Sequence, residues 1–151
     1  MQDREKPPLG IRIFTPIFFI LSSLAALYWF FFRTFEIFIN PLSPVEVFDK
    51  GSFYMLGVGI GLLILAIVTV QEGWLNKKLS KKQSSFLTKV AILSVVLIFL
   101  TPQLMHYCAN KYLARKGYTV CDEASHQWLF VRDIVYLEPS VDCTKDIVKA
   151  Q

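Results

Sequence analysis

Three cysteines are the residues best suited to covalent chemistry, and Cys108, Cys121 and Cys143 all fall in the C-terminal third of the chain. Cysteines confined to one part of a small protein are typical of disulfides formed in an oxidising compartment. Three cysteines allow three single pairings, each leaving one thiol. We favour Cys121 with Cys143, because this bond would join the two ends of a small hairpin predicted below. Cys108 with Cys121 stays open as an alternative.

The same cysteines, together with His106 and His126, include the ligand types that zinc prefers. However, the chain has no CxxC pair and no HxxxH on one helix, and zinc sites usually show such spacings. Ser125 and His126 are neighbours, so on a strand their side chains point to opposite faces, and no GxSxG motif surrounds the serine. The sequence therefore predicts no catalytic residue, no metal site and no cofactor, in a protein that is not an enzyme.

The cysteines, the histidines and Ser125 would be positioned by long apolar segments of the chain. Hydrophobic residues make up 54% of the 151-residue chain, charged residues only 19%, and the mean hydropathy is +0.44. This composition is too apolar for an ordinary soluble domain. It is concentrated at residues 13–32, 53–70 and 90–105. Because about 20 apolar residues in a helix cross the hydrocarbon layer of a bilayer, we predict three transmembrane helices.

The three segments contain no Asp, Glu, Lys, Arg or His. Transporters, pumps and membrane enzymes usually keep an ionisable side chain at depth, because that side chain does the work. A channel or carrier formed by one copy of this chain is therefore disfavoured. The spans indicate a protein that binds rather than transports.

Small residues at a spacing of four favour close packing of helices. The second segment contains Gly57 and Gly61, and the first contains Ser22 and Ala26 at similar depth. An antiparallel pair of helices would bring these two faces together. We favour packing within the three-helix bundle, and a face offered to a partner helix is the alternative.

The net charge of +4 is better explained by sidedness than by a nucleic-acid partner. Residues 71–89 hold five lysines and one acid, which marks this loop as cytoplasmic. Residues 1–12 then lie in the cytoplasm, whereas the loop at 33–52 and the tail at 106–151 lie outside. In a bacterium we expect an inner-membrane protein with a periplasmic C-terminus. The lysines are Lys77, Lys78, Lys81, Lys82 and Lys89.

The outer tail is predicted to have structure of its own. Residues 103–116 continue the third helix beyond a kink at Pro102, and Gly117 closes it. Residues 118–121 and 128–137 are rich in β-branched and aromatic side chains, with turn chemistry at 122–126 between them. The expected fold is thus a membrane all-α fold of three transmembrane helices, with a small extracytoplasmic helix extension and a β-hairpin. A lone hairpin needs a staple or support from the helix ends and the first loop.

One stretch of the tail resembles a family of small uncharacterised enterobacterial inner-membrane proteins, a domain of unknown function. The resemblance lies in Tyr107-Cys108, Lys116-Gly117-Tyr118, Cys121, Ser125 and Val135-Tyr136. In size and three-span architecture the chain is also similar to the immunity proteins that protect bacteria against pore-forming bacteriocins. That similarity implies binding to a toxin domain within the membrane and assigns no residues.

The hypothesis drawn from the sequence is a multi-pass inner-membrane binding protein, most plausibly an immunity protein against a membrane-targeting or pore-forming toxin. Its expected partners are the lipid bilayer and a toxin or another membrane protein, with neither nucleic acid nor a small-molecule substrate. The alternative is an accessory subunit of an envelope or transport complex. Candidate partner contacts are Glu36, Glu46, Asp49, Trp128 and Arg132.

Overall fold

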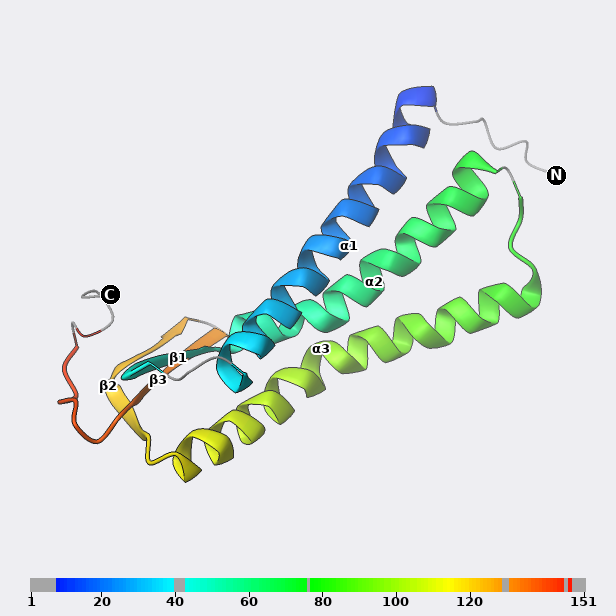
Figure 1. Ribbon diagram of the computed structural model, residues 1–151. Coiled ribbons are helices and arrows are strands. Elements are labelled where there is room, and N and C mark those ends of the chain that lie inside the picture. Colours follow the sequence, from blue (N-terminus) through cyan, green and yellow to red (C-terminus); the bar gives the residue numbers. More distant parts are fainter. Residues whose placement is uncertain (1–7, 40–42, 76, 129–130, 146, 148–151) are drawn as a thin grey trace.

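Three long helices and a small antiparallel sheet at one end make up the protein (Figure 1). The computed structural model describes residues 8–39, 43–75, 77–128, 131–145 and 147. The elements in chain order are α1 (Leu9–Phe38), β1 (Val45–Asp49), the 3₁₀ helix η1 (Lys50–Tyr54), α2 (Met55–Val68), the π-helix η2 (Thr69–Trp74), α3 (Lys81–Arg115), β2 (Thr119–Trp128) and β3 (Val131–Leu137).

Three helical segments are long and apolar enough to cross a membrane: Leu9–Phe38, Lys50–Trp74 and Lys81–Arg115. Each contains one of the predicted spans and extends beyond it. Residues 81–89, expected in the cytoplasmic loop, are helical because α3 begins at a capping box. Ser80 Oγ accepts a hydrogen bond from the Gln83 N–H at 3.2 Å, and Gln83 Oε1 accepts one from the Ser80 N–H at 3.1 Å.

The end of α3 follows the prediction closely. The helix continues past Pro102 to Arg115, and Gly117 takes a φ of 88°. The Tyr118 N–H bonds to the Leu113 carbonyl at 3.1 Å and the Gly117 N–H to the Ala114 carbonyl at 3.1 Å. These two bonds form a Schellman motif, which requires a residue that tolerates positive φ. It turns the chain directly into β2.

The central helix α2 uses two opposite faces for close packing. A Cβ at Gly57 would lie 2.6 Å from both the Ile98 nitrogen and the Ser94 carbonyl oxygen of α3, and at Gly61 the nearest atom is Ser94 Oγ at 3.4 Å. The expected pairing of Gly57 and Gly61 with the first span is therefore wrong. Two residues along a helix rotate by about 200°, so Gly59 points the other way, toward α1.

The contact between α1 and α2 is made by residues next to the predicted ones. The buried Ser23 hydroxyl donates to the Gly59 carbonyl at 2.7 Å, and a Cβ at Gly59 would meet Leu27 Cγ at 2.7 Å. Ala26 is buried, whereas Ser22 is half-buried. Helix α2 thus lies between α1 and α3 (Figure 1).

The sheet contains a strand that the sequence did not predict. Its order is β1-β3-β2, with β1 coming from the segment 33–52 that was expected to be a loop. β1 pairs with β3 from Val45↔Leu137 to Asp49↔Asp133. A strand this short leaves only a weak pattern in the sequence, and its pairing with β3 is what identifies it.

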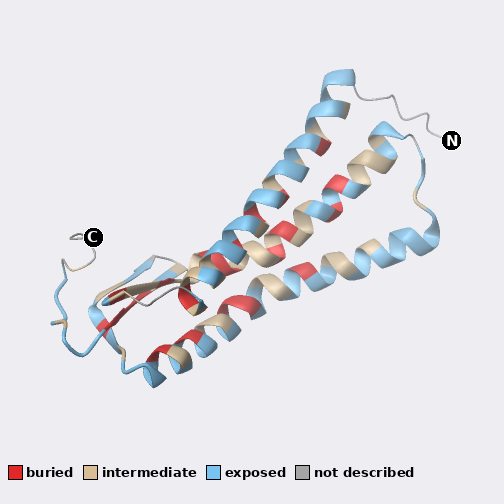
Figure 2. Cartoon of the chain, in the orientation of Figure 1, coloured by how far each residue is buried: buried red, intermediate tan, exposed pale blue. Residues whose placement is uncertain are grey.

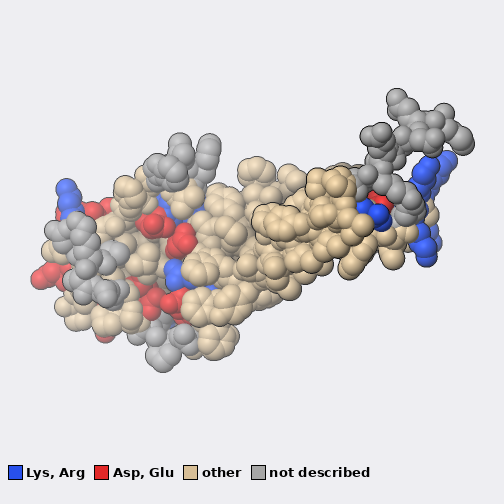
Figure 3. Space-filling model, turned by 90° about the horizontal axis from the view of Figure 1, so that it is seen from above, with Lys and Arg blue, Asp and Glu red and all other residues tan. Residues whose placement is uncertain are grey.

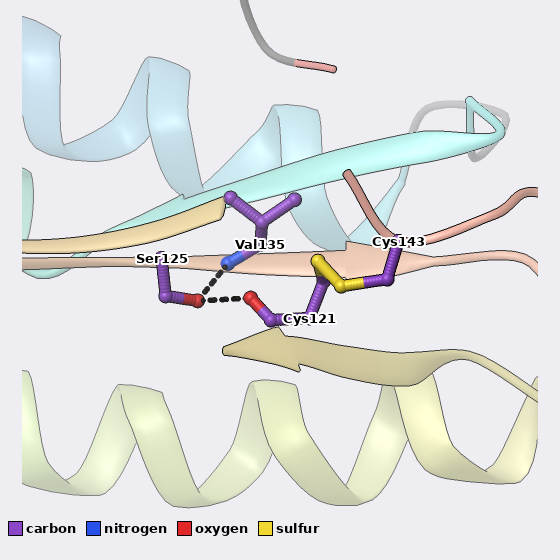
Figure 4. Close-up of a disulfide and its surroundings, with 4 residues drawn as sticks. All are labelled: Cys121, Ser125, Val135 and Cys143. Carbon is purple, nitrogen blue, oxygen red and sulfur yellow. Dashed lines mark hydrogen bonds between the residues drawn. A yellow bond between two sulfur atoms is a disulfide. The ribbon is translucent and has the colours of Figure 1, made fainter. Parts of the chain in front are cut away.

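The turn expected at residues 122–126 is also wrong, because β2 runs on to Trp128. Cys121 pairs with Val135 and His126 with Asp133, so the segment between them holds extra residues that bulge out of the ladder. The Ser125 side chain bridges β2 and β3 at this bulge. Its hydroxyl donates to the Cys121 carbonyl at 2.7 Å and accepts from the Val135 N–H at 3.1 Å (Figure 4).

The buried core joins the sheet to the helix ends (Figure 2). The Phe48 ring of β1 stacks on Phe53 at 4.8 Å, and Phe53 meets the Phe30 ring of α1 edge-on at 6.0 Å. Tyr136 of β3 and Leu113 of α3 complete the same cluster. The sheet therefore rests on all three helical segments, as the prediction of a supported hairpin required.

Candidate functional site

The sheet unit is fastened by the disulfide Cys121–Cys143 (Figure 4), which confirms the favoured pairing. Cys121 lies on β2 and Cys143 follows β3, 22 residues later, with Cα atoms 5.6 Å apart. Cys121 is buried in a small cluster with Val45, Val135 and Leu137. Cys108 is exposed and unbonded on α3. The bond thus holds the segment after β3 against the sheet.

The acidic residues predicted as partner contacts have partners within the chain. Glu36 forms an ion pair with Arg33, and Glu46 Oε1 accepts from the Ser43 N–H at 2.7 Å. Asp49 caps η1, where it accepts from the Gly51 N–H at 2.7 Å and from the Ser52 hydroxyl. Their contact with a partner protein stays a prediction.

Arg132 and Trp128 are the other predicted contacts. Arg132 forms an ion pair with Asp122 at 3.7 Å; the Arg132 side chain is about half exposed and the Asp122 side chain is largely exposed. Trp128 ends β2 opposite Val131, and its side chain lies outside the described part of the structure. Arg132 is therefore the predicted contact best placed to meet another molecule.

A polar chain connects the sheet to two helical segments. Trp29 Nε1 of α1 donates to the Ser52 hydroxyl at 2.9 Å, and that hydroxyl donates to Asp49. Arg33 of α1 donates through Nη2 to the Val47 carbonyl at 3.1 Å. These bonds attach β1 and η1 to α1.

Asp49 also faces Asp133 across the sheet. The two residues pair in register, and their carboxyl groups hydrogen-bond. Partial burial raises the pKa of Asp133, and the negative charge of Asp49 and this hydrogen bond raise it further. His126, opposite Asp133 on β2, and Arg33 act in the other direction. Asp133 therefore keeps its proton to a higher pH than an isolated aspartate does.

This pair predicts that mild acid stabilises the sheet unit. Asp133 binds its proton more tightly in the folded protein than in the unfolded chain, so stability falls as pH rises from its ordinary pKa of 3.8 through the raised one. Thermal melts between about pH 4 and pH 7 should show this fall. Asp133→Asn should flatten it, whereas Asp142→Asn, at an exposed position, should not. An unchanged slope in Asp133→Asn would contradict the raised pKa of Asp133.

Residues that could bind a metal do not converge in the described part of the chain: no group of three His, Cys, Asp or Glu side chains has that arrangement. His106 packs beside the Phe48 ring at 5.6 Å, on the core side of α3, while Cys108 is exposed. The Ser125 hydroxyl is engaged in the β2 bulge. His106 and Ser125 therefore take part in packing and in strand pairing.

The family model DUF1240, described as a protein of unknown function, matches residues 45–143. These residues form well over half of the chain. The chain belongs to the DUF1240 family. Membership of a family of unknown function is thereby confirmed, while the enterobacterial source and the likeness to immunity proteins stay predictions. No curated protein and no solved structure shows a significant match to the chain.

The DUF1240 match begins at the first residue of β1 and ends at the second cysteine of the disulfide. It therefore takes in the whole sheet, α2, α3 and the covalent fastening. Helix α1 lies outside it, yet supplies Trp29, Phe30 and Arg33 to the junction. This contact between α1 and the sheet was not predictable from the sequence, because β1 lies in a segment that was expected to be a loop.

Proposed function

We propose that this DUF1240 chain is a multi-pass inner-membrane protein that binds another protein at the periplasmic face of that membrane. The support for membrane insertion is the distribution of charge. Lys, Arg, Asp and Glu gather at the two ends of the face shown in Figure 3, with an uncharged band between them. The uncharged residues 13–32 of α1 match the hydrocarbon layer of about 30 Å in length.

The proposed sidedness places the sheet outside. The lysine-rich segment that follows η2 and begins α3 lies at the opposite end from the sheet (Figure 1), and such segments stay in the cytoplasm. The disulfide lies at the sheet end, in agreement with an oxidising periplasm. In this arrangement the start of α1 lies on the cytoplasmic side, because three spans separate it from the sheet.

The observation that carries the binding function is the fastening of the sheet to the helix ends. The sheet shares one core with all three helical segments and is closed by a disulfide. A rigid surface of this kind loses little conformational entropy when a partner binds. We propose that the partner is a membrane-inserting or pore-forming toxin, which the chain neutralises as an immunity protein.

A second candidate is an accessory subunit of an envelope or transport complex. Helix α3 favours it, because only 11% of its most apolar window is buried, against 28% for Lys50–Trp74. Its exposed residues, including Phe99 and Leu104, could pack against the helices of a larger complex.

Protection of living cells tests the immunity function. We expect the chain to fractionate with membranes and to protect a sensitive bacterial strain against a membrane-inserting toxin, above all one whose gene adjoins this one. Arg132→Glu should lower protection by about tenfold through charge repulsion at an exposed contact. Lys145→Glu, also exposed, serves as the matched control.

Equal amounts of both variants in the membrane fraction would make the comparison valid. Full membrane insertion without protection against such toxins would remove the immunity function and favour the accessory subunit, which co-purification with envelope proteins would then reveal. A chain found in the soluble fraction would overturn the membrane location itself.

A further inference from the structure

A groove lies at the end of the molecule opposite the sheet, between α1 and η2. Its volume is about 200 Å³, and its walls are mostly hydrocarbon, from Ile11, Pro16 and Val68 among others. Two of its lining residues have special backbone properties. Pro16 lies inside α1 without an N–H for the helical ladder, and Gly73 presents no side chain from η2. A Cβ at Gly73 would meet no atom within 4 Å.

A guanidinium group lies at this groove and is held in a defined position. Arg12 donates through Nε to the Gly73 carbonyl at 2.6 Å and through Nη2 to the Trp74 carbonyl at 3.3 Å. An arginine has five N–H donors, so these bonds leave others for a ligand. Glu72 also lines the groove, but within the described residues no ion pair joins it to Arg12.

The surroundings of the groove are basic. The chain that follows η2 carries Lys77 and Lys78, both exposed, and α3 begins with Lys81 and Lys82. Figure 3 shows blue side chains gathered at this end of the molecule, with little red among them. The groove therefore combines an apolar floor, a fixed guanidinium and an excess of positive charge.

We propose that the groove binds an anionic phospholipid, with the phosphate against Arg12 and one acyl chain along the apolar floor. Basic pockets between helices on the cytoplasmic side of membrane proteins bind such headgroups. Arginine suits phosphate because its planar fork can donate two bonds at once. A π-helix at the wall agrees with this assignment, since π-turns are frequent at functional sites. The assignment rests on the membrane location proposed above.

The test fills the groove without disturbing the arginine. Gly73→Leu places a side chain in the open space and keeps both carbonyl acceptors, because these belong to the backbone. Gly10→Leu is the matched control: Gly10 is exposed on α1 at the same end, and a Cβ there also meets nothing within 4 Å. Each protein is purified in micelles that contain equal phosphatidylglycerol and phosphatidylcholine, and the retained lipid is measured by native mass spectrometry.

We expect the wild-type chain and Gly10→Leu to retain phosphatidylglycerol over phosphatidylcholine by about fivefold, and Gly73→Leu to lose most of that preference. Glu72→Gln should increase retention, because it removes the negative charge in the groove. Should Gly73→Leu melt early, Lys77→Gln with Lys78→Gln, at two exposed positions, provides the second arm and should lower the preference.

Equal retention of the two lipids by the wild-type chain, or unchanged retention in Gly73→Leu, would overturn the proposal. Displacement of the lipid by inorganic phosphate alone would assign the site to free phosphate and overturn it equally. Fractionation of the same cells before detergent is added reports the membrane location separately, so its failure is distinguishable from failure of the lipid site.

Discussion

Gly57→Ile is expected to prevent the chain from accumulating in folded form. A Cβ at this position would lie 2.6 Å from the Ile98 nitrogen and the Ser94 carbonyl oxygen, which are backbone atoms of α3 and cannot move independently. α2 and α3 would have to separate, which breaks the contact that holds α3 to the bundle. Even Gly57→Ala should lower the free energy of unfolding by about 3 kcal/mol, at the upper end for overpacked cores.

The other glycines of α2 supply a graded control. A Cβ at Gly59 meets the Leu27 side chain at 2.7 Å, which can shift, so Gly59→Ala should cost about 1 kcal/mol. At Gly61 the nearest atom is Ser94 Oγ at 3.4 Å, so Gly61→Ala should be close to neutral. Thermal melts in detergent should rank the variants in this order. Normal accumulation of Gly57→Ile with loss of a partner alone would instead assign this face to an intermolecular contact.

Removal of the Cys121–Cys143 disulfide should have the second large effect. The bond closes a loop of 22 residues, and the chain entropy returned to the unfolded state corresponds to about 3 kcal/mol. The double variant Cys121→Ser with Cys143→Ser also places a hydroxyl in the buried cluster with Val135. We expect earlier melting and rapid proteolysis of the sheet unit, with the helices retained longer.

Cys108→Ser is the matched control, because Cys108 is exposed and unbonded. It should melt like the wild-type chain, and a reducing agent should lower the melting temperature of both to that of the double variant. If reduction left the melting temperature unchanged, the shared core with the helix ends would be sufficient to hold the sheet.

The helices were predictable because their signal is local. Three segments are apolar over a length typical of membrane spans or of large cores, and each lies within an observed helical segment. They are residues 13–32, 53–70 and 90–105. Gly117 likewise predicts the end of α3, since its positive φ follows from local backbone geometry. The cysteine pairing was favoured because it would join the two ends of the predicted hairpin, and it is confirmed.

The sequence predicted a hairpin, but it predicted neither the third strand, β1, nor the bulge in β2. Strand β1 is short and gains its stability from β3, which is far away in sequence. The bulge in β2 is stabilised by Ser125, whose partners are Cys121 on its own strand and Val135 on the next. The expected turn is replaced by this bulge, because β2 resumes its pairing with β3 at His126 instead of ending.

By itself, the sequence determined three apolar helices and the closure of α3 at Gly117, because hydropathy and backbone preference act over short distances. It favoured the disulfide only through the predicted hairpin. The tertiary structure alone decided that Gly57 faces α3 while Gly59 faces α1, that β1 completes the sheet, and that Asp49 and Asp133 meet across it. Each of these depends on which distant elements pack together. A periodic pattern shows that a face is suited to packing, and only the assembled chain shows what it packs against.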